Sequence, residues 1–244
     1  MIFLICLNLI FTKTLNFASY NWKTFDNFDE RSQNYFVKGL VQVSGDKLLL
    51  TCESLELDGK LILRSSGVIS EKKFLYGTFI FEVEGDLNSL LHACFAPFLY
   101  DFDEGKFEVD IEFSRWGNPS SPAGNYGVIR QFGSWKNPDS VKRKTKKFGL
   151  PASRRPVISR HYLKWFPDSI VFESYYLQKG KERLIEKWKV SDKMFVPDKP
   201  MNVEIYLWWP ENPKFKMVHE VKVLKFIYMP LARPIPQGRF SSYP

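Results

Sequence analysis

The chain has 244 residues, 44% of them hydrophobic and 16% aromatic, which is long enough for one large β domain with a sizeable core. The aromatic content favours strands, and no window sustains the 3.6-residue period of a helix, so a helical fold is excluded. The net charge of +8 favours acidic partners such as sulfated glycans, anionic envelope polymers or nucleic acid.

The beginning of the chain has features of a secretory leader. Residues 2–11 are largely apolar but too few to span a bilayer, and Ala18 and Ser19 are small residues suited to cleavage. We therefore expect a leader over residues 1–19, although its basic start is missing, and a secreted or periplasmic protein. The alternative is a buried N-terminal strand. No other segment is apolar enough to cross a membrane.

Cysteine and histidine give no sign of a metal site. Removal of the leader would take Cys6 and leave Cys52 and Cys94, which either pair or remain as buried free thiols. The three histidines show no ligand-type spacing with the cysteines. They are His92, His161 and His219. We expect neither a metal nor a cofactor.

The remaining chain reads as a series of short strands. Residues 20–45 mix aromatic residues with Asp and Asn, as an edge segment wrapping a sandwich would. The polar turn at residues 101–105 makes the strands on either side of it neighbours. Further strands are expected at residues 47–52, 60–64, 77–83, 161–166, 169–174, 183–190, 203–209 and 219–229.

The most informative stretch is residues 107–113, Phe-Glu-Val-Asp-Ile-Glu-Phe. Successive side chains of a strand point to opposite faces, so Glu108, Asp110 and Glu112 share one face and the apolar residues between them share the other. Like charges in a row repel one another, and a sheet gains nothing from them unless cations or hydrogen bonds answer them. The row therefore indicates a functional site, and an ordinary half-exposed strand is the alternative.

Cleavage of a glycosidic bond needs such a row of carboxyl groups. In retaining enzymes, one carboxylate attacks the anomeric carbon and a protonated one, roughly 5 to 5.5 Å away, protonates the leaving oxygen. The α-carbons of Glu108 and Glu112 should lie about 13 Å apart, so their side chains would have to lean toward each other across Asp110. We expect the three acids to line the floor of an open cleft.

Two segments that follow the acidic strand are expected to be loops. Residues 117–127 are rich in Asn, Pro, Ser and Gly, as a loop at the rim of a cleft would be. Trp116 enters this loop and Trp135 follows it, and either could stack on a sugar, although a single Trp more often belongs to a core. The basic block from Lys142 to Lys147 is bounded by turn residues, which predicts a solvated loop and leaves contact with an anionic glycan possible.

The acidic strand resembles the active-site strand of glycoside hydrolase family 16. The resemblance covers residues 46–230, and its most specific part is residues 108–118, where Arg-Trp-Gly follows the acids as in a bacterial subgroup of the family. Supporting matches are Ser66-Gly67-Val68, Tyr76-Gly77-Thr78-Phe79, residues 161–168, with a different His-to-Trp spacing, and Pro200-Met201 to Leu207-Trp208. This resemblance implies an all-β, concanavalin-like β-jelly-roll sandwich of two antiparallel sheets over residues 20–230, followed by a surface tail at residues 231–244.

The resemblance also implies residue roles. Glu108 would be the nucleophile, Glu112 the general acid and base, and Asp110 the residue that assists between them. Members of the family commonly have a Trp in the preceding strand, where this chain has none, so Phe98 or Tyr100 would replace it as a sugar-stacking platform.

The leading interpretation is a monomeric, secreted, retaining endo-glycosidase that hydrolyses a β-linked polysaccharide, a glucan or a galactan. One alternative is a non-catalytic, lectin-like carbohydrate-binding protein on the same fold. Another is an envelope protein whose basic block holds it to anionic polymers. We expect no nucleic acid partner, because no recognised binding module accompanies the basic block.

Overall fold

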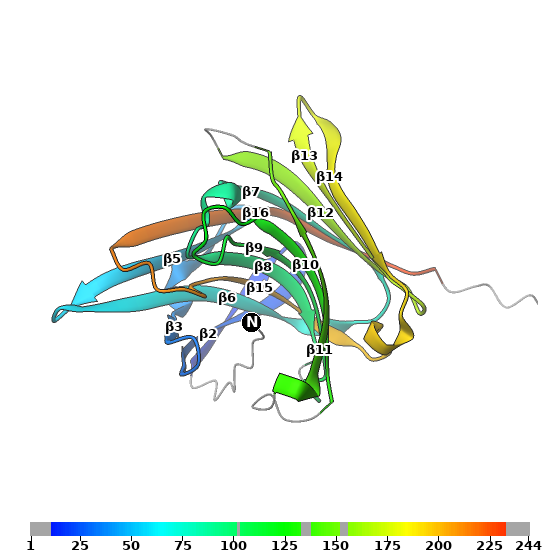
Figure 1. The fold of residues 1–244 in the computed structure, drawn as a ribbon, viewed down its shortest axis with the longest axis horizontal. Helices are drawn as coiled ribbons and strands as arrows, with labels where there is room; N and C mark the ends of the chain where they lie inside the picture. Colours follow the sequence, from blue (N-terminus) through cyan, green and yellow to red (C-terminus); the bar gives the residue numbers. More distant parts are fainter. Residues whose placement is uncertain (1–10, 102, 133–137, 152–155, 233–244) are drawn as a thin grey trace, which may run out of the picture.

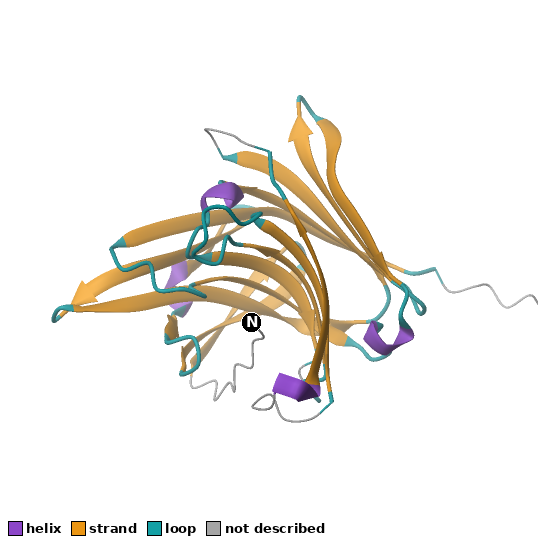
Figure 2. Ribbon diagram, in the orientation of Figure 1, coloured by secondary structure: helices purple, strands orange, loops and turns teal. Residues whose placement is uncertain are grey.

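A computed structural model describes residues 11–101, 103–132, 138–151 and 156–232, and strands form most of this part of the chain (Figure 2). The strands are β1 (Phe11–Phe17), β2 (Tyr20–Asp29), β3 (Asn34–Phe36), β4 (Val41–Ser44), β5 (Lys47–Leu57), β6 (Lys60–Phe74), β7 (Gly77–Gly85), β8 (Cys94–Tyr100), β9 (Phe107–Phe113), β10 (Gly124–Gln131), β11 (Val141–Phe148), β12 (Val157–Trp165), β13 (Ile170–Gln178), β14 (Lys181–Val190), β15 (Met201–Trp208) and β16 (Met217–Pro230). Short 3-10 helices lie at Lys38–Leu40, Leu87–Ser89, Pro138–Ser140 and Lys193–Phe195.

The strands form two packed layers (Figure 1). The front sheet has the order β11-β10-β9-β8-β15-β6, and the back sheet has the order β5-β16-β7-β12-β13-β14. Strand β6 belongs to both sheets: its residues Lys60 to Arg64 pair with β5 in the back sheet, whereas its later part pairs with β15 in the front sheet. All pairings are antiparallel in the described residues except that of β3 with β6. This is the sandwich that the sequence predicts.

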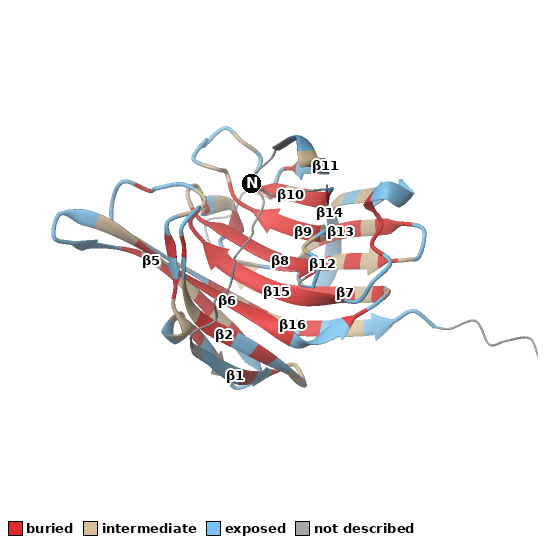
Figure 3. Cartoon of the chain, turned by 90° about the horizontal axis from the view of Figure 1, so that it is seen from below, coloured by how far each residue is buried: buried red, intermediate tan, exposed pale blue. Residues whose placement is uncertain are grey.

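The core lies between the two sheets because each strand turns alternate apolar side chains inward. Val109, Ile111 and Phe113 of β9 belong to the same core cluster as Phe79 and Phe81 of β7, and all five are fully buried. Figure 3 shows how far the buried residues extend along the front sheet. The strand predicted at residues 77–83 is therefore confirmed as part of β7.

Two predicted loops are wrong in part. The segment after the acidic strand returns to the sheet at Gly124 as β10, and the basic block lies in β11 at the edge of the front sheet. The charges of the block concealed its alternation, in which Phe148 at its end packs into the core. The polar turn at residues 101–105 does make β8 and β9 neighbours, as predicted.

The N-terminal segment enters the sandwich as β1, which pairs with β2. Leu15 and Phe17 are 9% and 1% exposed, and the indole of Trp22 donates a hydrogen bond of 3.0 Å to the carbonyl of Phe17. Ala18 and Ser19 form the turn between the two strands, with φ angles of 53° and 65°. Residues 11–17 thus form a strand with Leu15 and Phe17 buried. The leader over residues 1–19 and the alternative of a buried strand over the apolar segment stay predictions, because residues 1–10 lie outside the described residues.

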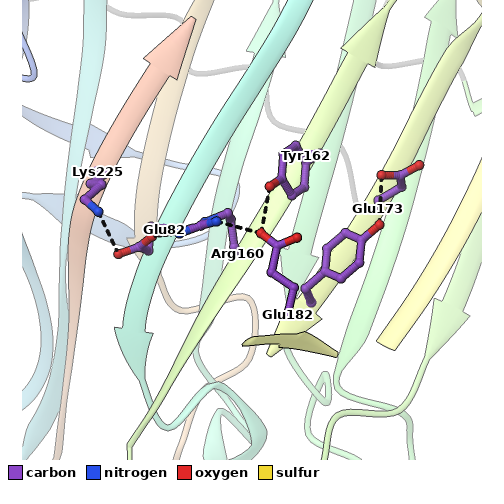
Figure 4. Close-up of polar contacts among 7 residues, drawn as sticks. Glu82, Arg160, Tyr162, Glu173, Glu182 and Lys225 are labelled. Atoms are coloured by element: carbon purple, nitrogen blue, oxygen red, sulfur yellow. Dashed lines mark hydrogen bonds and ion pairs between the residues drawn. The ribbon is translucent and has the colours of Figure 1, made fainter. Parts of the chain in front are cut away.

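The outer face of the back sheet is covered by charges that pair with one another (Figure 4). Glu82 accepts from Arg160 and lies 3.5 Å from the ammonium of Lys225. Arg160 also contacts Glu182 at 2.6 Å, and the hydroxyl of Tyr162 donates to the same carboxylate. The carboxylates of Glu82 and Glu182 are therefore answered by cations and a hydroxyl of the same sheet.

Cys52 and Cys94 are both free and buried. Cys52 lies in the core between the sheets, and Cys94 lies on the opposite, outer side of the front sheet. Of the two alternatives for these cysteines, the structure therefore has two separate free thiols and no disulfide between them. No helix within the described ranges is long and apolar enough to cross a membrane.

Candidate active site

The three predicted acids lie on the outer face of the front sheet. Because Val109, Ile111 and Phe113 point into the core, Glu108, Asp110 and Glu112 point away from the back sheet. The front sheet is arched in Figure 1, and its hollow side is the one turned away from the back sheet. The acids therefore occupy the concave face, as the sequence predicts.

Strand register sets the neighbours of each acid. Asp110 lies opposite Gly127 of β10 and opposite Phe98 of β8, and Glu108 lies opposite Tyr100. Glu112 lies opposite Asn125, whose side-chain amide donates a hydrogen bond of 2.8 Å to its carboxylate. Asn125 thereby fixes the position of one of the two acids that catalysis would require.

The acids are much less accessible than expected. Glu108, Asp110 and Glu112 are 2%, 2% and 7% exposed, so the expected position on the floor of an open cleft is wrong. One oxygen of Glu108, one of Asp110 and the amide oxygen of Asn125 are buried without a hydrogen-bond partner among the described residues. Buried acceptors without partners carry a free-energy cost of about 1 to 3 kcal/mol each, which a bound ligand that donates hydrogen bonds would remove.

Burial also changes the protonation of the acids. Desolvation raises the pKa of Glu108 and of Asp110 well above the usual range, and the charge of Glu112 raises both further. Desolvation raises the pKa of Glu112 as well, while its hydrogen bond from Asn125 lowers it. The three groups are thus close enough to influence one another. Their pKa directions do not separate a nucleophile from an acid.

A fourth carboxyl group, which the sequence analysis missed, lies on the same face. Glu204 of β15 is opposite Phe98, two strands from Asp110, and is buried. Desolvation raises the pKa of Glu204 to about 8, although the nearby Tyr206 side chain opposes the shift. The sequence signal was present, since Glu204 alternates with the core residues Val203 and Ile205, but the strand around it is otherwise strongly apolar.

Aromatic side chains surround the acids. Phe98 and Tyr100 belong to one buried cluster with Tyr206 and Trp208, and Trp116 packs against that cluster, with its ring centroid 6.3 Å from that of Trp208. The structure therefore brings together all the predicted platform residues it describes. Trp135, the remaining candidate, lies outside the described residues.

Arg115 organises the loop that carries Trp116. Its guanidinium donates to the carbonyls of Asn88, Pro119 and Ser121 and to the side chain of Asn88, at 2.7 to 2.9 Å. Trp116 itself has a φ of 52°, in the left-handed region that is unfavourable for a bulky residue. The Arg-Trp-Gly segment is therefore held in shape by Arg115, a role that the sequence did not reveal.

The two layers and the row of acids on the hollow face define a concanavalin-like β-jelly-roll. No protein-family model and no curated protein sequence matches the chain. Several solved structures, in contrast, match the chain. A β-glucanase of Bacillus licheniformis is 14% identical with a TM-score of 0.61, and the match covers 89% of this chain and 97% of that one.

Two further solved structures extend the comparison. A family 16 glycoside hydrolase from a mixed-linkage glucan locus of Bacteroides ovatus, in complex with a G4G4G3G product, is 11% identical with a TM-score of 0.62, covering 85% of this chain and 94% of that one. The laminarinase catalytic domain of Thermotoga maritima is 10% identical with a TM-score of 0.56, and the match covers 87% of this chain and 92% of that one. The chain thus has the fold of the family 16 β-glucanases, and the expected resemblance is confirmed for the fold.

Proposed function

We propose that the protein is a retaining endo-glycosidase that hydrolyses a β-linked polysaccharide. The observation that carries the proposal is the row of three carboxyl groups on the concave face of a β-glucanase fold. The charge of Glu112 raises the pKa of Glu108 and of Asp110, and Glu112 itself accepts a hydrogen bond from Asn125. The solved relatives named above include β-glucanases and a laminarinase, which supports a glycan as the substrate.

The reaction would use the acids in two steps. Glu108 attacks the anomeric carbon while Glu112 gives its proton to the departing glycosidic oxygen, which leaves a glycosyl ester on Glu108. Glu112 then takes a proton from water as the water oxygen displaces Glu108 from the anomeric carbon. Asp110 lies between the two and would orient one carboxyl group, and Asn125 holds Glu112 in place through the hydrogen bond of 2.8 Å.

The proposal requires the concave face to open. Glu108 must be ionised to attack, yet burial favours its protonated form, and no polysaccharide can contact side chains that are 2% exposed. Entry of water and substrate would lower the desolvation cost and the pKa of Glu108.

A reducing-end assay over purified β-glucans and galactans tests the activity. Glu108→Gln should abolish sugar release, and Glu112→Gln should abolish it except toward substrates with good leaving groups, which need no proton. Glu220→Gln, at an exposed acid of the back sheet, is the matched control and should retain full activity. Unchanged sugar release in a folded Glu108→Gln protein would refute the proposal.

The burial of the acids favours a second candidate, a non-catalytic carbohydrate-binding protein on the same fold. In that case protonated carboxyl groups would serve as hydrogen-bond partners of sugar hydroxyls. Polysaccharide binding by the unaltered protein, without release of reducing ends under any condition, would distinguish this candidate. Export remains part of the leading proposal and rests on the expected leader over residues 1–19.

A further inference from the structure

Strand β11 forms the edge of the front sheet next to the candidate site. It spans Val141–Phe148 and carries five cationic residues among its eight. In a strand, alternate residues face opposite sides, so the five cations are divided between two faces that differ in their surroundings. Lys142, Lys144 and Lys146 lie on one face, where Lys144 and Lys146 form ion pairs, and Arg143 and Lys147 lie on the other face.

The first group faces the edge of the back sheet. The ammonium of Lys144 lies 2.8 Å from the carboxylate of Asp192, and that of Lys146 lies 3.8 Å from Glu186. Phe148 on the same side packs into the core. The charges of Lys144 and Lys146 are therefore answered by acids of this chain.

The second group faces the acids. Arg143 of β11 lies opposite Ile129 of β10, which in turn lies opposite Glu108 of β9. In the same way, Lys147 lies opposite Asn125, which lies opposite Glu112. Two strand spacings place each cation's α-carbon about 10 Å from that of the acid in its row. Both cations are exposed, and neither has an ion pair with any residue that the structure describes.

Electrostatics agrees with this placement, because the charge of Arg143 lowers the pKa of both Glu108 and Glu112. Lysines on an edge strand also discourage pairing with other sheets, and that role would account for the cations on both faces equally. It does not account for the placement of Arg143 and Lys147 in the same cross-strand rows as Glu108 and Glu112.

We propose that Arg143 and Lys147 bind an anionic substituent, a sulfate ester or a carboxylate, of the polysaccharide that occupies the concave face. The inference rests on the proposed function and narrows its substrate to charged β-linked polymers. A guanidinium offers a planar pair of N–H donors that matches either group, and Lys147 adds a second charge at the same rim. Thr145, between them in the strand, contributes a hydroxyl on the same face.

The test uses two matched pairs of polymers: a sulfated galactan with its desulfated form, and a neutral β-glucan with its C6-oxidised, carboxylated form. Rates and KM are compared for the unaltered protein, for R143Q/K147Q and for the control K144Q/K146Q, which removes the same charge from the other face. Binding of all four polymers is measured separately on E108Q proteins. Each folded state is checked by thermal unfolding.

For at least one pair, we expect R143Q/K147Q to raise KM on the anionic member about tenfold or more, as the loss of charge-assisted hydrogen bonds predicts, and to leave the neutral member unchanged. The control should keep the anionic preference. Whichever pair responds identifies sulfate or carboxylate as the group bound.

The two proposals fail in different ways. Hydrolysis of neutral and anionic members at equal efficiency, or an equal loss in both double variants, would overturn the charge inference and leave the glycosidase intact. Binding of an anionic polymer that depends on Arg143 and Lys147, with no hydrolysis of any polymer, would support the recognition surface and overturn the glycosidase.

Discussion

Asp110 lies directly opposite Gly127 across strands β9 and β10, at a position where no side chain fits. A Cβ atom placed on Gly127 would lie 2.3 Å from Oδ1 of Asp110 and 2.5 Å from Oδ2. The backbone of Gly127 also lowers the pKa of the Asp110 carboxyl group, against the larger effect of desolvation. Glycine is thus required here for the central acid to lie flat against the neighbouring strand.

Gly127→Ala should displace the carboxyl group of Asp110 and lower turnover about a hundredfold, the loss expected for a misplacement near 1 Å. The cost in stability should be about 1 to 3 kcal/mol, as for other overpacked sites. Gly149→Ala is the control, since nothing lies within 4 Å of its added Cβ. Full activity of a folded Gly127→Ala protein would show that the position of Asp110 does not matter.

Glu204 should make stability depend on pH. Its folded-state pKa is raised from 4.5 to about 8, so its contribution is fully present below pH 4.5 and is lost as the pH rises through 8. Between these values, the free energy of unfolding falls by up to about 1.4 kcal/mol per pH unit for this one proton. Glu204→Gln should flatten that slope in urea unfolding between pH 4 and 9.

The slope should not vanish, because burial raises the pKa values of Glu108 and Asp110 in the same direction. Glu56→Gln, at an exposed acid of the β5–β6 hairpin, provides the control. Parallel pH profiles for the unaltered and Glu204→Gln proteins would contradict a protonated Glu204.

Arg115→Ala should loosen the loop that carries Trp116. Hydrogen bonds from a charged donor contribute about 1.5 to 3 kcal/mol each, and four are lost. We expect limited proteolysis within residues 114–123 and a higher KM for polysaccharide. Arg115→Lys keeps the charge but not the fork of donors, so it should resemble Arg115→Ala. Resistance of both variants to protease would rule out the role of Arg115 in the loop.

A chain that begins at Tyr20 should be less stable than one that begins at Phe11, because only the latter retains β1. Burial of Leu15 and of Phe17 contributes about 1.5 to 3 kcal/mol each, and the indole of Trp22 loses its acceptor. Thermal unfolding of the two chains provides the comparison. Equal stability would instead favour a leader that ends at residue 19.

Cys94 can report the opening of the concave face. Its thiol lies on that face, and burial together with the charges of Glu112 and Asp110 raises its pKa, which slows its reaction. In a Cys6→Ser protein, Cys94 should nevertheless react with a thiol reagent faster than Cys52, which becomes accessible only when the two sheets separate. Equal rates for the two thiols would mean that the face stays closed to a polymer.

The sequence predicts the sandwich and the acid row because both follow from alternation, a property of each strand alone. The prediction is wrong for β11, because a run of Lys and Arg is typical of a solvated loop, although Phe148 at its end is buried in the core. Glu204 is not predicted as a site residue, because its place in the site depends on its position relative to Asp110, which is distant in sequence and two strands away. The burial of the acids depends on packing around the whole face, which no local pattern encodes.

Strand β6 has a mechanical consequence. Since one continuous strand is hydrogen-bonded into both layers, the sheets cannot slide past each other or hinge apart without breaking its ladders. A polymer must therefore enter through movement at the rims, where loops and edge strands are paired with fewer neighbours. The strands that carry the acids should stay rigid throughout a catalytic cycle.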